Sequence, residues 1–182
     1  MDEKKWEWRD FKEGEIFSKE GFRVSLMPPK GNLLVSGDLS KAFSYLDLDV
    51  PMLGMDGIAK DNFAMLTGTN KCLLSTRERI EVENGWFEEG FMISSADFQW
   101  KQLHLEGSAT KMVLAQGIMH ELTSRSCITM VFGKVSLVVQ SGSGYFLFVD
   151  SPYLQYFIDC LDSCDLIVDG NNPLMGYGKH DS

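Results

Sequence analysis

The sequence predicts an α+β fold: a pseudo-symmetric repeat of two ferredoxin-like halves, each ordered strand, helix, strand, strand. Two observations predict it. Residues 33–37 (LLVSG) are matched by residues 103–107 (LHLEG), an offset of 103 − 33 = 70, and a helical pattern follows the glycine in both copies. Each copy then continues into two short apolar runs separated by turn residues, which is typical of a β-hairpin.

The second half begins with a strand and a helix. Residues 102–106 (QLHLE) alternate apolar and polar side chains, which predicts a half-buried strand. Ser108 is a suitable N-cap for a helix over residues 109–122, where apolar side chains recur every four residues from Leu114 onward.

The rest of the second half alternates apolar runs with turn signals. Residues 127–132 (CITMVF) and 135–140 (VSLVVQ) flank Gly133-Lys134, which indicates a hairpin. Residues 145–149 (YFLFV) form a further strand, and Ser151-Pro152 opens a closing amphipathic helix.

The first half follows the same plan. Residues 22–37 hold two apolar runs broken by Pro28-Pro29, and the second run is the strand of the repeat. Residues 63–66 (FAML) and 72–75 (CLLS) predict a hairpin, because Gly and Asn lie between them. Residues 76–92 are acidic and polar, which predicts a connector or a short helix and hairpin between the halves.

These patterns divide the 182 residues into three parts. Residues 22–164 are expected to form a single domain of two halves, 22–90 and 91–164. Residues 1–21 are expected to form an N-terminal arm, and residues 165–182 an extended C-terminal tail.

Charge and composition narrow the function classes. A net charge of -9 argues against a nucleic-acid surface, because binding to phosphates needs clustered Lys and Arg. The sequence has no apolar run near 18 residues, so no membrane span is expected. The charged N-terminus does not resemble a secretory signal, and a cytoplasmic protein is therefore expected.

Candidate metal and acid–base residues are sparse. The three histidines, His104, His120 and His180, have no neighbour at metal-ligand spacing. The acidic pairs at residues 81 and 83 and at 88–89 are expected to be solvated rather than catalytic.

The cysteines and the glycine-rich loop give no catalytic pattern either. Cys72 follows Lys71 but has no histidine near it in sequence, and Cys160 and Cys164 supply two ligands where a zinc site needs four. Buried reduced thiols are the simpler interpretation. Residues 142–144 (GSG) do not open a helix, so they are no dinucleotide fingerprint. The sequence predicts no catalytic, cofactor-binding or metal-binding residue in this chain.

The N-terminal arm supplies the candidate interface. Trp6 and Trp8 stand among charged residues without a clean helical or strand period. Large exposed aromatic side chains are costly in water, so a surface is expected to cover them. That surface is either a partner subunit or this domain's own sheet.

Short motifs in order resemble the gamma subunit of heterotetrameric sarcosine oxidase. They include 26–29 (LMPP) and the strand end 33–38 (LLVSGD), then 67–74 (TGTNKCLL) against the family's Leu-Gly-Pro-Asp-Glu-Trp-Leu-Leu phrase. In the second half, 116–122 (QGIMHEL) is similar to the helix end Lys-Gly-Cys-Pro-Leu-Asp-Leu, and 127–133 (CITMVFG) to the family's hairpin. The resemblance covers about residues 22–164.

The resemblance implies a non-catalytic small subunit that packs on the large alpha and beta flavoprotein subunits. Those subunits hold FAD, FMN, NAD and tetrahydrofolate in the family. The complex oxidises sarcosine, or another N-methyl amino acid in a close relative, and the methyl carbon passes to tetrahydrofolate. The implied fold is that of the folate-binding domain of the glycine-cleavage T-protein class.

Two alternatives stay open from the sequence. The first is a stand-alone folate or small-molecule binding protein of the same fold class. The second is a self-associating interaction module. A binding protein would gain thermal stability from its ligand, whereas a subunit would aggregate without its partners.

Overall fold

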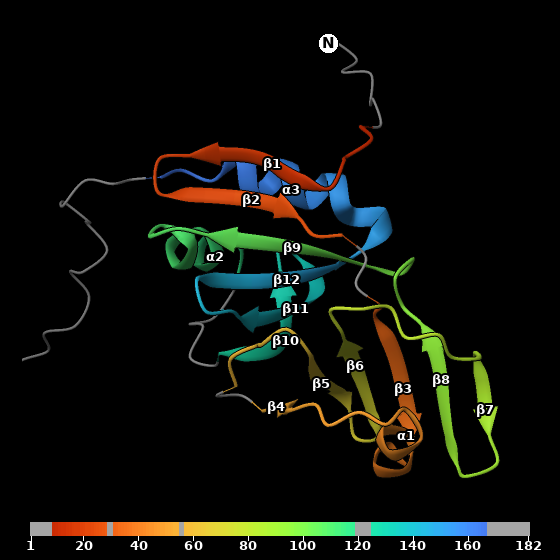
Figure 1. Cartoon of the computed structure of the whole chain (residues 1–182). Helices are drawn as coiled ribbons and strands as arrows, with labels where there is room; N and C mark the ends of the chain where they lie inside the picture. The colour runs from red at the N-terminus through yellow and green to blue at the C-terminus, as the bar shows by residue number, and fades with distance from the viewer. Residues whose placement is uncertain (1–8, 29–30, 55–56, 119–124, 167–182) are drawn as a thin grey trace, which may run out of the picture.

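The computed structural model describes residues 9–28, 31–54, 57–118 and 125–166 of the chain. Over these residues, two six-stranded sheets pack face to face, and helices cover the outer face of each sheet (Figure 1). The strands of one sheet run across those of the other in the view of Figure 1.

The first sheet, here called the β3 sheet after a central strand, has the order β4-β5-β6-β3-β8-β7. Its pairs are antiparallel, except that β4 and β5 run parallel. Its strands are β3 (Leu33–Gly37), β4 (Met52–Leu53), β5 (Phe63–Gly68), β6 (Lys71–Ser75), β7 (Gly85–Phe87) and β8 (Phe91–Ser95). Helix α1 (Leu39–Tyr45) packs on the outer face through Ala42.

The second sheet, the β9 sheet, has the order β1-β2-β9-β12-β11-β10 and is antiparallel throughout. Its strands are β1 (Gly14–Lys19), β2 (Phe22–Leu26), β9 (Trp100–Glu106), β10 (Ser126–Val131), β11 (Lys134–Gln140) and β12 (Gly144–Asp150). Its outer face is covered by α2 (Thr110–Gly117) and by α3 (Leu154–Ser163), which follows the short 3-10 helix η1 (Ser151–Tyr153).

The layer between the sheets is a separate apolar core. Met65 and Leu73 of the β3 sheet pack there with Leu137 of the β9 sheet. The rings of Phe63 and Phe148 meet edge to face, with centroids 6.1 Å apart. Because these side chains alternate with others that face the helices, both sheets are buried on two faces where they overlap.

Each half contributes one hairpin to the sheet that the other half otherwise forms. The β1–β2 hairpin precedes β3 in the chain, but β2 pairs with β9 and sets Val24 opposite Leu105. The β7–β8 hairpin precedes β9, but β8 pairs with β3 and sets Ile93 opposite Val35. With the hairpins exchanged in this way, the two sheets share one strand order, which confirms the predicted pseudo-symmetric α+β repeat.

Two glycines allow the turns of the exchanged hairpins to pack closely against the opposite half. Gly37 and Gly107 have φ values of 97° and 110° and stand where β3 and β9 turn toward their helices. A Cβ at Gly37 would lie 2.4 Å from the carbonyl oxygen of Gly90, and a Cβ at Gly107 would lie 2.3 Å from that of Gly21. Both carbonyls belong to the turns of the exchanged hairpins, so the equivalence of the two corners is confirmed.

The exchange corrects the divisions expected from the sequence. Residues 14–19 lie in the expected arm but form β1, because Ile16 and Phe17 pack against the core of the β9 sheet. Residues 76–92 include β7 and the start of β8, so the hairpin expected as one alternative is present there without a preceding helix. The expected boundary between residues 90 and 91 falls at the turn of this hairpin. Most of the expected tail, 167–182, lies outside the described residues.

Helix α2 is shorter than predicted. Its N-cap is Ala109 rather than Ser108, and its C-cap, Ile118, has extended backbone and bridges to Val131 of β10. A Cβ at Gly117 would lie 2.7 Å from the ring of Phe132, and the N–H of Phe132 donates to the Gly117 carbonyl oxygen at 2.7 Å. Pairing with the hairpin therefore accompanies the end of the helix at Gly117.

The turn between β10 and β11 lies one residue earlier than predicted. Phe132 and Gly133 both have positive φ, 49° and 75°, as a type I′ turn requires. The hairpin itself is confirmed. In the described part of the chain, no helix is both long and apolar enough to span a membrane.

Candidate functional site

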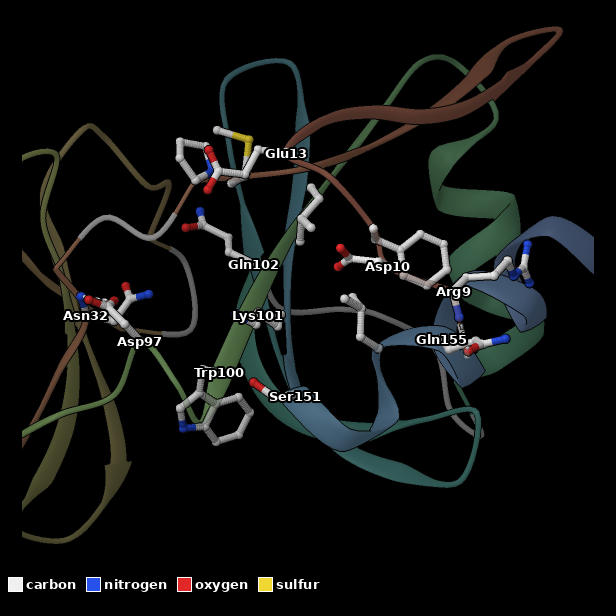
Figure 2. Close-up of a pocket in the computed structure, with 15 residues that line it drawn as sticks. Arg9, Asp10, Glu13, Asn32, Asp97, Trp100, Lys101, Gln102, Ser151 and Gln155 are labelled. Atoms are coloured by element: carbon white, nitrogen blue, oxygen red, sulfur yellow. Dashed lines mark hydrogen bonds between the residues drawn. The ribbon is translucent and has the colours of Figure 1, made fainter. Parts of the chain in front are cut away.

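A cavity of about 260 Å³ lies where four distant segments of the chain meet (Figure 2). The start of β9 forms its middle, between Asn32 and Asp97 at one end and Asp10 and Gln155 at the other (Figure 2). The β2–β3 connection, the segment before β1 and the start of α3 complete the wall. None of these segments is long enough to form a cavity alone, so the exchange of hairpins creates it.

Buried polar atoms stand around this cavity. Asn32 Oδ1, Trp100 Nε1 and Gln102 Oε1 are buried, and none has a hydrogen-bond partner among the described residues. Each unpaired buried polar atom costs about 1–3 kcal/mol. The backbone N–H of Asn32 is satisfied, since it donates to Asp97 Oδ1 at 2.7 Å. The wall therefore holds two unused acceptors and one unused donor, all closed to solvent in this conformation.

The charges of the cavity are mixed. Asp10, Glu13 and Lys101 line it, as does Arg9, whose guanidinium pairs with Asp159 on α3. With opposite charges interleaved, the cavity does not select a strongly charged ligand. Its chemistry suits water or a small polar molecule.

A second polar cluster joins β9 to the loop before β12. His104 Nε2 lies 3.1 Å from Ser141 Oγ, and His104 Nδ1 lies 3.6 Å from Glu106 Oε2. This order of groups is that of a serine–histidine–acid triad. However, Ser141 is only 6% exposed, and its Oγ accepts a hydrogen bond from the N–H of Gly144 at 3.1 Å. These contacts tie the turn before β12 to β9 around a serine that is buried in this conformation.

The remaining candidates from the sequence are not brought together. Cys72 is completely buried in the core under α1, where burial raises the pKa of its thiol to about 11. Such a thiol is protonated and inert at neutral pH. Cys160 and Cys164 lie four residues apart at the end of α3, where the thiol of Cys164 donates to the carbonyl oxygen of Cys160 at 3.3 Å.

Other candidates lie outside the described residues or are solvated. Trp6, Trp8, His120 and His180 fall outside the described residues, so the expected interface stays a prediction. The glutamates at 81, 83, 88 and 89 are exposed. Across the described part of the chain, no group of three or more His, Cys, Asp or Glu side chains is placed to hold a metal ion.

Sequence reasoning missed both clusters. The cavity collects residues from the 9–13, 26–32, 97–102 and 151–155 segments, and Ser141 stands 37 residues from His104. No local motif marks either set. Gln102 gave no signal either, because it falls on the polar face of the alternating strand 102–106 together with His104 and Glu106.

Comparison with known proteins gives a match in fold alone. No protein-family model matches the sequence, and no curated protein matches it significantly. Among solved structures, the chain is similar to a chain of the heterotetrameric sarcosine oxidase from Corynebacterium sp. U-96 in complex with pyrrole 2-carboxylate. The TM-score is 0.58 at 14% sequence identity, and the match covers 76% of this chain and 82% of the other. This likeness is one of fold, and it indicates a distant structural relationship to a chain of that complex.

Proposed function

We propose that this chain is a non-catalytic small subunit of a multi-subunit flavin-dependent oxidoreductase of the sarcosine oxidase type. The observation that carries the proposal is the shared fold with a chain of a heterotetrameric sarcosine oxidase over most of both chains. In the proposed complex, large alpha and beta subunits in the cytoplasm hold FAD, FMN, NAD and tetrahydrofolate. They oxidise an N-methyl amino acid and pass its methyl carbon to tetrahydrofolate, while this chain packs against them.

The described side chains support a packing role. The serine of the triad-like cluster is buried and already hydrogen-bonded, and the Cys72 thiol is held protonated by burial. Neither group is available as a nucleophile at neutral pH. The chain's contribution to a reaction is then structural: it stabilises subunits that carry the cofactors.

Co-expression tests the proposal. The chain is produced together with large flavoprotein subunits of the sarcosine oxidase type from the same organism, and the mixture is separated by size exclusion. We expect one complex that contains this chain and bound flavin, and that oxidises sarcosine or another N-methyl amino acid. The isolated chain should bind no flavin and turn over no substrate. Flavoprotein subunits that assemble with full stability and activity without this chain would rule the proposal out.

The cavity favours a second candidate function, the binding of a small polar molecule. Its volume of about 260 Å³ is below the roughly 300–1,000 Å³ of sites for drug-sized ligands, so a ligand smaller than folate fits better. A ligand with both donors and acceptors would pair with Asn32, Trp100 and Gln102 after a small rearrangement.

Thermal melting separates the two candidates. A binding protein gains about 2.7 kcal/mol at a ligand concentration one hundred times Kd. Amino acids, N-methyl amino acids and tetrahydrofolate are added in turn to the isolated chain. A rise in melting temperature that Gln102→Leu abolishes would favour the binding function, and no rise with any of them would exclude these ligands.

A further inference from the structure

The β7–β8 hairpin carries an exposed apolar pair on the face of the β3 sheet that α1 does not cover. Trp86 stands directly opposite Met92, and the two side chains are 68% and 39% exposed. Their neighbours Phe87, Phe91 and Ile93 point to the other face and pack in the core with α1. The hairpin is thus anchored on one face and apolar but uncovered on the other.

The fold itself does not require an apolar pair there. The exchanged β1–β2 hairpin occupies the equivalent place in the β9 sheet, and its second cross-strand pair from the turn is Ser18 opposite Arg23. The second pair from the turn of the β7–β8 hairpin is Trp86 opposite Met92. Arg23 is satisfied locally, since its guanidinium lies 3.7 Å from Glu106 and 4.0 Å from Glu15. The same structural position is therefore polar in one half of the molecule and apolar in the other.

Charge around the pair indicates what covers it. Glu83, Glu88 and Glu89 flank β7 and its turn, and all three are exposed. The whole chain carries a net charge of -9. A second copy of this chain would bring like charges together at the contact, which disfavours self-association. A partner with an apolar pocket bordered by lysine and arginine complements both the aromatic side chain and its acidic rim.

We propose that Trp86 and Met92 form the centre of a docking surface for a partner protein that presents a basic-rimmed apolar pocket. Tryptophan and methionine are enriched in interface cores, and a buried tryptophan is a frequent hot spot. That this partner is one of the large flavoprotein subunits rests on the proposed function. The surface itself rests on the comparison between the two hairpins.

Site-specific photo-crosslinking in the cells of origin tests the surface. The photoreactive residue p-benzoylphenylalanine replaces Trp86 or Met92 in the full chain, and in matched controls it replaces Ser18 or Arg23 of the other hairpin. We expect one discrete heavier adduct from each of the first two positions and none from the controls. Mass spectrometry identifies the partner, and the cross-linked segment should contain apolar residues beside Lys or Arg.

Two double variants measure the dependence of the complex on this pair. Trp86→Ser with Met92→Arg installs the residue types of the other hairpin, so the fold is expected to persist with an unchanged melting curve. We expect the identified partner to co-purify at least about tenfold less. The matched control is Met130→Ser with Val135→Arg, which alters another exposed apolar cross-strand pair, 46% and 59% exposed, on the β10–β11 hairpin. It should leave co-purification unchanged.

The outcomes separate this inference from the proposed function. A flavoprotein partner with the expected variant dependence supports both. A different partner with the same dependence and a basic, apolar contact supports the docking surface and overturns the proposed function. Flavoproteins that co-purify equally with the Trp86 and Met92 variant overturn the docking surface and leave the proposed function standing. Adducts with a second copy of the chain, equal adducts from the control positions, or no adduct at all also overturn it.

Discussion

At Gly37 and Gly107, a single added Cβ atom would disturb the packing of the exchanged hairpins. Each glycine turns its strand toward a helix with a φ near +100°, and each lies under a hairpin carbonyl. The hairpin turn is tied to the same corner by backbone bonds, since the N–H of Ala109 donates to Gly21 O at 2.9 Å and that of Asp38 to Gly90 O at 3.1 Å. Any side chain at these corners pushes the other half's hairpin away.

Gly107→Ala is therefore expected to lower the free energy of unfolding by about 1–3 kcal/mol, because it adds a strained φ and a 2.3 Å contact. Gly14→Ala is the matched control: its φ is 105°, but no atom lies within 4 Å of the added Cβ. Urea unfolding compares the two. Equal losses of unfolding free energy in both variants would show that the contact with Gly21 adds nothing to the effect of Gly107→Ala.

The buried Cys72 thiol makes the free energy of unfolding depend on pH. Burial raises the pKa of its thiol from 9.0 to about 11, so the folded state holds the proton more tightly than the unfolded state. The stabilisation is complete below pH 9.0 and is lost as pH rises to about 11. A shift of this size corresponds to about 2 to 3 kcal/mol.

Cys72→Ala should be less stable than the parent at neutral pH, because it leaves a cavity, but its stability should fall less steeply between pH 9.0 and about 11. Burial also raises the pKa of Cys127, Tyr145 and Cys164, so only the difference between variant and parent isolates Cys72. Denaturant midpoints measured across this pH range supply that difference. Parallel curves for parent and variant would contradict the assignment.

At the scale of elements, α1 depends on its cap. It has seven residues, too few for a stable isolated helix, and the Oδ1 of Asp38 accepts a hydrogen bond from the N–H of Lys41 at 3.1 Å. Helix α2 is the equivalent helix of the second half, and no side chain caps its N-terminus. The effect of a cap can therefore be judged by comparing the two helices within one molecule.

Asp38→Ala should cost about 1 kcal/mol of unfolding free energy, since it removes the cap. Asp38→Asn is the control, because asparagine caps as well as aspartate while losing the exposed ion pair with Lys41. Thermal melting of the three proteins is sufficient. A loss in Asp38→Asn as large as that in Asp38→Ala would assign the effect to charge instead of capping.

At the scale of the whole molecule, the exchanged hairpins make each sheet depend on both halves. A fragment of residues 1–83 holds β3 to β6 but lacks β7 and β8, and residues 84–182 hold β9 to β12 but lack β1 and β2. Each fragment alone leaves a central strand unpaired on one side and its apolar face exposed.

Neither fragment is expected to unfold cooperatively by itself, whereas an equimolar mixture refolded from denaturant should form a one-to-one complex. Size exclusion and circular dichroism report both results. A fragment with its own cooperative transition would show that the halves are separate domains, contrary to the single domain expected for residues 22–164.

The sequence alone determined the repeat, because the elements of each half are specified by local pattern. Alternation predicted β9, turn residues predicted the β5–β6 and β10–β11 hairpins, and the 70-residue offset related Gly37 to Gly107. The α+β class followed from the order of these elements. Local chemistry was sufficient here because apolar period and turn composition act within a few residues.

Tertiary structure decided which strands pair and which residues meet. The extent of α2 was set by the bridge between Ile118 and Val131, and sheet membership was set by hairpins that leave their own half. The cavity and the cluster around His104 both arise from segments far apart in the chain. Such contacts depend on packing between elements, and packing free energy belongs to pairs of surfaces that no local pattern records.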